Sequence, residues 1–194
     1  LEYDFAKKVF KKQNFDDEFR RSRSNFDPIR KLGFINTYNG YLKVTTSGNE
    51  LIKREEKVSE LFLKALLKWQ LPNFTQIKDY KSDDGYNIIP LVGFIKLIKS
   101  LNKKNGKSVG ISRDEIKIFL PSLINIDYVD EFAEAIIKFR NKLKSIKKRK
   151  DKSLFIEETY KKFTKKYKFT NPYSTSKDYG DNLRRYFLYT DLFK

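Results

Sequence analysis

Two short runs of apolar and β-branched residues, Ile35–Tyr38 and Tyr41–Val44, flank the pair Asn39-Gly40. Asparagine followed by glycine best accepts the two positive φ angles of a type I′ turn, which is the turn that joins tightly connected antiparallel strands. The pattern therefore predicts a β-hairpin over residues 35–44.

Helix signals lie on both sides of this predicted hairpin. Pro28 suits the first turn of a helix, where its missing N–H costs little, and Gly33 is the residue type expected just beyond a helix end. After the hairpin, Thr45, Thr46 and Ser47 offer an N-cap for a second helix. A helix, a two-stranded wing and a further helix are typical of a winged helix-turn-helix, in which the helix before the wing usually enters a DNA major groove.

Apolar residues recur at helical spacing from Val58 to Trp69 and predict a helix with the tryptophan on its buried face. Pro72 is expected to end this helix, and residues 73–85 have the weak periodicity of a linker. We therefore expect a first winged-helix subdomain over residues 1–72.

A second subdomain is expected over residues 86–194. An apolar stripe from Ile88 to Ile98 predicts its first helix. Ser112 and Glu115 have the spacing of a capping box and predict the start of a second helix that ends near Pro121. A further helix is predicted from about Asp127. Its buried face is expected to contain Phe132, Ile136, Phe139 and Leu143.

The last segment of the chain has a pattern similar to that of the first subdomain. Residues 181–188 have the layout of residues 28–35, a basic helix that runs into an apolar stretch. Under this hypothesis, Leu192 and Phe193 begin a second wing, and the second subdomain is truncated at its C-terminal end inside a larger parent protein.

An incomplete second wing would leave aromatic side chains exposed, and a terminal helix is the alternative to it. If the wing is incomplete, Tyr186, Phe187 and Phe193 lack part of their cover. The alternative is a terminal helix over residues 179–193 with its arginines in solvent. The predicted fold class is mainly α with small β-hairpins, arranged as tandem winged helix-turn-helix units.

The charge of the chain indicates what kind of partner it binds. Lys and Arg total 42 and Asp and Glu total 25, which gives a net charge of +17 and a pI near 9.8. Residues 138–168 alone contain 14 basic and three acidic residues, a net charge of +11. A chain this basic is suited to a polyanion such as nucleic acid, the alternative being a highly charged solvated surface.

Candidate base-reading residues lie before the hairpin and near the C-terminus, because arginine reads guanine edges, asparagine reads adenine and serine bonds phosphate. The candidates are Arg21, Arg23, Ser24, Asn25, Lys177, Arg184 and Arg185. The residues expected to hold phosphates are Arg20, Arg30, Lys31, Tyr38, Asn39, Lys43, Lys147, Lys148 and Lys150.

The sequence offers little material for catalysis. It contains no His and no Cys, so it lacks the commonest general base, a thiolate metal site and any disulfide, as is usual in a reducing cytoplasm. Glu-x-Lys tripeptides at 55–57 and 115–117 lie in helical pattern, without the upstream acid that a Mg²⁺-dependent nuclease would need. No P-loop or membrane-spanning apolar run is present. We expect no catalytic residue, metal or cofactor in this chain.

The order of several motifs resembles the recognition half of AlwI-like type IIS restriction endonucleases. Two of these motifs are Ile29-Arg30-Lys31-Leu32-Gly33-Phe34-Ile35 and Tyr179-Gly180-Asp181-Asn182-Leu183-Arg184-Arg185-Tyr186. The others lie at 40–45, 48–51, 66–72, 89–91, 111–115 and 136–140. The resemblance covers nearly the whole chain, and it rests on the combination of motifs rather than on one of them.

This resemblance implies a multi-domain bacterial enzyme of the cytoplasm. Its N-terminal winged-helix modules would read a short asymmetric site in double-stranded DNA, and a separate C-terminal PD-(D/E)xK domain would cut nearby with Mg²⁺. This chain resembles only the reading half, so the resemblance implies DNA binding as a monomer, without cleavage and without contact with a membrane.

Two other classes of function stay open. A free-standing winged-helix transcription regulator usually binds a palindrome as a dimer, with half-sites about one helical turn apart. A structural module could instead present its basic face to an acidic protein.

Overall fold

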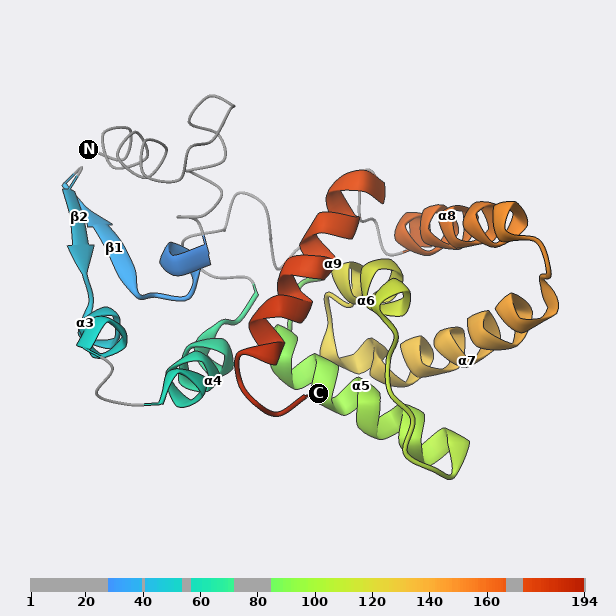
Figure 1. Cartoon of the computed structure of the whole chain (residues 1–194), viewed down its shortest axis with the longest axis horizontal. Helices are drawn as coiled ribbons and strands as arrows, with labels where there is room; N and C mark the ends of the chain where they lie inside the picture. Colours follow the sequence, from blue (N-terminus) through green and yellow to red (C-terminus); the bar gives the residue numbers. More distant parts are fainter. Residues whose placement is uncertain (1–27, 40, 54–56, 72–84, 167–172, 194) are drawn as a thin grey trace. The chain divides into compact units, whose positions relative to one another are not determined.

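The structure is a computed structural model that describes residues 28–39, 41–53, 57–71, 85–166 and 173–193 (Figure 1). The chain divides into two compact units, residues 1–69 and residues 70–194, which we describe separately. The described part is mostly helical, with one two-stranded antiparallel sheet, so the predicted mainly α class with a small hairpin is confirmed.

The described part of the first unit begins with a helical turn over residues 28–31. Gly33 has a positive φ of 77°, and its N–H donates to the Arg30 carbonyl at 3.0 Å. The Phe34 N–H reaches back to the Ile29 carbonyl, also at 3.0 Å. These two bonds form a Schellman motif, so the predicted stop at Gly33 is confirmed.

Strands β1 (Ile35–Tyr38) and β2 (Tyr41–Val44) form the predicted hairpin. They are antiparallel and pair Ile35 with Val44 at the base and Tyr38 with Tyr41 at the tip. Asn39 has a φ of 50°, the positive value that a type I′ turn requires of its first central residue.

Thr45 connects the hairpin to helix α3 (Thr46–Lys53). Its hydroxyl oxygen accepts a hydrogen bond from the Gly48 N–H at 3.1 Å, which is the predicted N-cap, and the same hydroxyl donates to the Gly33 carbonyl at 2.7 Å. Gly48 is buried, and a Cβ there would lie 2.0 Å from the Phe34 carbonyl oxygen. Only glycine therefore allows α3 to approach the start of β1 this closely.

Helix α4 (Val58–Lys68) completes the described part of the first unit. Leu61 and Leu66 are buried on it, and Phe62 lies against Phe34 with ring centroids 5.4 Å apart. Trp69 follows the helix and is buried, as its position in the apolar stripe predicts. Pro72 and most of the predicted linker lie outside the described residues.

Helices α5 (Pro90–Asn105) and α7 (Val129–Ser145) pack against each other in the second unit (Figure 1). Helix α5 begins two residues after the predicted start, because Ile88 pairs with Leu71 in an isolated β-bridge. It also continues past the predicted stripe and ends at Gly106, whose positive φ of 66° closes the last turn.

Helix α6 (Arg113–Phe119) begins with the predicted capping box. The Ser112 hydroxyl accepts from the Glu115 N–H at 3.2 Å, and the Glu115 carboxylate accepts from the Ser112 N–H at 2.8 Å. The chain then passes through two 3₁₀ turns, Leu120–Ser122 and Ile126–Tyr128, into α7.

Aromatic rings join α6 and α7 to helix α8 (Arg149–Lys166). Phe119 lies edge-on to Phe139 and Phe163, at centroid distances of 5.6 Å and 4.9 Å, and Phe155 stacks on Phe139 at 5.4 Å. Phe139, Phe155 and Phe163, which belong to the basic segment 138–168, therefore pack in the core.

Helix α9 (Tyr173–Leu188) packs on α6, and the chain turns back after it. The predicted strand at Leu192 and Phe193 is wrong, because Phe193 folds onto Phe94 and Phe187 at centroid distances of 5.1 Å and 6.3 Å. Phe187 is 1% exposed, so the predicted lack of cover is also wrong for this residue. The described residues of the second unit contain no hairpin.

Candidate nucleic-acid interface

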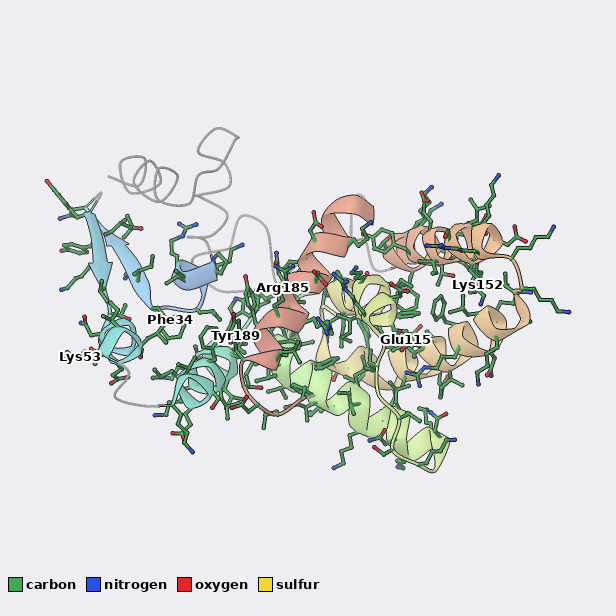
Figure 2. All side chains as sticks on the ribbon, in the orientation of Figure 1. Phe34, Lys53, Glu115, Lys152, Arg185 and Tyr189 are labelled. Carbon is green, nitrogen blue, oxygen red and sulfur yellow. The ribbon has the colours of Figure 1, made fainter. Side chains whose placement is uncertain are left out.

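The contact between α6 and α9 carries a fork of charged side chains. Arg113, the first residue of α6, donates from Nε to Oδ1 of Asp181 at 2.8 Å and from Nη2 to Oδ2 at 3.0 Å. Arg185, one turn further along α9 (labelled in Figure 2), donates from Nη2 to the same Oδ2 at 3.3 Å. The hydrogen bond from Arg113 lowers the pKa of Asp181, so this carboxylate stays ionised at neutral pH.

Gly180 fixes the distance between the two helices at this contact. A Cβ on Gly180 would lie 2.8 Å from the Lys117 Cα and 3.2 Å from the Ile116 carbonyl oxygen, both of them backbone atoms. Asp181 is the next residue, so the close backbone approach also sets where its carboxylate meets Arg113. The helices can cross this tightly only because position 180 has no side chain.

Glu115 and Arg140 form a second pair, which supports α6 from the side of α7. Arg140 donates from Nε to Oε1 at 2.7 Å and from Nη2 to Oε2 at 2.8 Å, and it also bonds the Gly110 carbonyl. The Glu115 side chain is 5% exposed, and its hydrogen bond raises the pKa of Arg140. Both carboxylate oxygens therefore accept hydrogen bonds within the protein, and Glu115 stabilises the packing of α6 on α7.

The α7–α8 tip, which we define as residues 146–150, is basic in a different way. Lys147, Lys148 and Lys150 are exposed, and no acidic side chain among the described residues pairs with them. Lys152, labelled in Figure 2, continues the basic surface along α8. Exposed ammonium groups on flexible stems are suited to phosphate contact rather than to base reading.

The β1–β2 hairpin offers a third surface in the first unit. Tyr38 is 69% exposed and Tyr41 65% exposed at its tip, and Asn39 and Lys43 are exposed beside them. No acidic residue occurs between positions 35 and 44. A two-stranded hairpin alone buries little surface, so polar and aromatic groups presented on it are available to a partner.

A cavity of about 370 Å³ lies between α5, α6 and α9. Its lining is mainly apolar and includes Phe94, Ile116 and Phe187, together with Arg113 and Arg184. Arg184 therefore lines the same cavity as Arg113, the arginine that is bonded to Asp181.

Metal ligation and membrane insertion have no visible basis in the described ranges. No group of three or more His, Cys, Asp or Glu side chains there could hold a metal ion. None of the helices described is both long enough and apolar enough to pass through a bilayer.

A comparison with protein families matches residues 30–194 to the AlwI restriction endonuclease family. The chain belongs to this family. No curated protein matches the chain significantly. Membership of the AlwI restriction endonuclease family implies DNA binding, so the three surfaces above are the places to look for contact with DNA.

The predicted contact residues of this AlwI-family chain fall into two groups. Arg20, Arg21, Arg23, Ser24 and Asn25 lie outside the described residues. The remaining candidates are described in both units of the chain. Arg30, Lys31, Tyr38, Asn39 and Lys43 lie in the first unit, Lys147, Lys148 and Lys150 at the α7–α8 tip, and Lys177, Arg184 and Arg185 on α9.

Sequence reasoning missed Arg113, Asp181 and Gly180 as parts of an interface in this AlwI-family chain. Arg113 is 68 residues away from Asp181 in sequence, so no local pattern connects them. The only available signal was Gly180. A glycine inside a helical pattern either lowers the stability of the helix or allows another backbone to approach closely.

Proposed function

We propose that this chain is the DNA-reading part of a type IIS restriction endonuclease, which binds one short asymmetric site in double-stranded DNA as a monomer. The observation that carries this proposal is the family match over residues 30–194. An enzyme of this kind has to find its site among many others. A net charge of +17 supplies the attraction to the phosphate backbone that such a search needs.

In this proposal the nuclease chemistry belongs to a separate PD-(D/E)xK domain outside residues 1–194. A protein site for Mg²⁺ needs oxygen ligands that are free to bind it. Glu115, from one of the two Glu-x-Lys tripeptides, is bonded to Arg140 through both oxygens and to the Ser112 N–H. Glu115 therefore has no free oxygen for Mg²⁺, and we place no cleavage step at it; the other tripeptide, at 55–57, lies mostly outside the described residues.

We assign the β1–β2 hairpin as a wing and the helix over residues 28–31 as the helix that enters the major groove. The order helix, hairpin and α3 supports this assignment, and so does the absence of acidic residues between positions 35 and 44. Tyr38, Asn39 and Lys43 would contact the DNA backbone, while Arg21, Arg23, Ser24 and Asn25 would read bases.

Selection of bound duplexes from a random pool tests the proposal. The 194-residue chain, without metal, should enrich a single asymmetric motif of a few base pairs. Enrichment of a palindrome bound by a dimer would favour a transcription regulator instead. Failure to enrich any motif would contradict a reading function.

A second arm tests the separation of reading from cutting. Highly purified chain is incubated with Mg²⁺ and a duplex that carries the selected motif. We expect intact DNA, and reproducible cleavage would show that the nuclease centre lies within these residues.

A further inference from the structure

The guanidinium of Arg113 is held by one edge and open on the other. A guanidinium carries five N–H donors, one on Nε and two on each terminal nitrogen. Asp181 accepts the Nε–H and one N–H of Nη2, at 2.8 Å and 3.0 Å. Nη1 and the second N–H of Nη2 donate no hydrogen bond to the described residues, and the Arg113 side chain is 58% exposed.

The open edge has the geometry that one particular base requires. The unused N–H groups of Nη1 and Nη2 lie side by side at the end of the planar fork. Guanine presents two adjacent acceptors, O6 and N7, in the major groove, and an arginine fork that meets both is the commonest specific contact. A carboxylate that fixes the inner edge orients the outer edge toward such a pair without competing for it.

We propose that Arg113 reads a guanine in the recognition site and that Asp181 is the positioning residue that holds its fork. The inference rests on the proposed function, since it needs duplex DNA at the α6–α9 contact. It adds a base-reading residue on α6 to the two arginines on α9 that the sequence indicates.

The surroundings of Asp181 keep this arrangement rigid. The Asp181 side chain is only 13% exposed, and Gly180 brings α9 within backbone contact of α6. Arg185 shares Oδ2 of Asp181 at 3.3 Å and is 65% exposed. Two guanidiniums therefore lie beside one carboxylate, which leaves a net positive charge at this point for the DNA backbone.

The test compares base preferences of variants by the same random-pool selection, followed by Kd measurements on single-base-pair substitutions of the selected motif. For the unchanged chain, replacing the guanine that Arg113 reads should weaken binding roughly tenfold or more. For R113A and R113K, the same replacement should change Kd by less than about twofold, because neither alanine nor lysine offers a two-donor fork. If R113A fails to fold, R113K carries the test with the charge retained.

D181N separates positioning from simple stabilisation. It removes the carboxylate that orients the fork and makes the surface one charge more positive. We expect discrimination at the same base pair to fall at least severalfold, while Kd for unrelated DNA stays equal or improves. A merely structural Asp181 would instead weaken binding to all duplexes equally.

E134Q is the matched control. It removes a carboxylate from the Lys104–Glu134 pair, a surface ion pair of 2.9 Å between α5 and α7, and should leave every base preference unchanged. If the unchanged chain enriches a motif and R113A keeps all its preferences, the inference fails and the proposed function stands. If the unchanged chain enriches no motif, both fail.

Discussion

The α6–α9 contact and the α7–α8 tip are both basic, but their cations are held in different ways. At the α6–α9 contact, Arg113 gives Asp181 two hydrogen bonds and Arg185 gives it a third. At the tip, Lys147, Lys148 and Lys150 are exposed, with no acidic partner among the described residues.

This difference separates two kinds of contact with DNA. A planar guanidinium fixed by a carboxylate can meet one arrangement of acceptors and reject others, whereas a flexible ammonium group attracts any phosphate. We therefore expect the α6–α9 contact to contribute choice of sequence and the α7–α8 tip to contribute affinity that depends on salt.

At the α6–α9 contact, the largest effect should come from removing Arg140, which supports α6 through Glu115. R140A leaves the Glu115 carboxylate buried without its charged partner, and breaking a buried pair in this way costs about 3 kcal/mol of unfolding free energy. Urea denaturation measures the loss. K104A, which breaks an exposed pair, should leave the midpoint unchanged, and equal midpoints for R140A and K104A would show that the pair does not support the fold.

The close approach of α9 to α6 gives the next largest effect. G180A places a Cβ 2.8 Å from the Lys117 Cα, so the helices must separate at a cost of about 1–3 kcal/mol. G110A is the control, because a Cβ at Gly110 meets no atom within 4 Å. We expect G180A alone to lower the urea midpoint and weaken base discrimination, and unchanged discrimination in a destabilised G180A would separate the reading function from this contact.

Substitution at the α7–α8 tip sharpens the other side of the comparison. The triple variant K147A/K148A/K150A should weaken binding to all duplexes alike. Its plot of log Kd against log salt should be shallower by about 0.9 for each lost phosphate contact. Fluorescence anisotropy at several salt concentrations measures this slope, and an unchanged slope would mean that the tip does not contact phosphates.

Protonation of Asp181 in acid should weaken the Arg113–Asp181 ion pair, and this should be the smallest of the four effects on the protein. Because Arg113 lowers the pKa of Asp181 from 3.8, the pair contributes fully above pH 3.8 and is lost as pH falls through the lower folded value. The difference in stability between the unchanged chain and D181N should therefore stay constant from about pH 8 to 5 and shrink below about pH 4. A difference that already shrinks near neutral pH would contradict this assignment.

Local chemistry made much of this fold predictable. Asn39-Gly40 determined the hairpin, Gly33 the Schellman end before it, and Ser112 with Glu115 the capping box of α6. Each of these features depends on residues within a few positions of one another, so the sequence pattern and the structure agree.

Features that depend on distant contacts were not predictable. The apolar residues after Leu188 suggested a strand, but the Thr190 hydroxyl caps the Phe187 carbonyl at 2.6 Å, Asp191 takes a positive φ of 57°, and Phe193 packs on Phe94. The pairs Arg113–Asp181 and Glu115–Arg140 join residues 68 and 25 positions apart, and their existence follows only from how the helices pack.

One measurement tests the division between reading and attraction most directly. The ratio of Kd for unrelated DNA to Kd for the selected duplex, together with the salt slope, is determined for R113A and for K147A/K148A/K150A. We predict that R113A lowers the ratio roughly tenfold, while its salt slope changes by at most about 0.9, the value for one phosphate contact. The triple variant should flatten the salt slope while the ratio stays within about twofold. Equal shifts of ratio and slope in both variants would contradict this division.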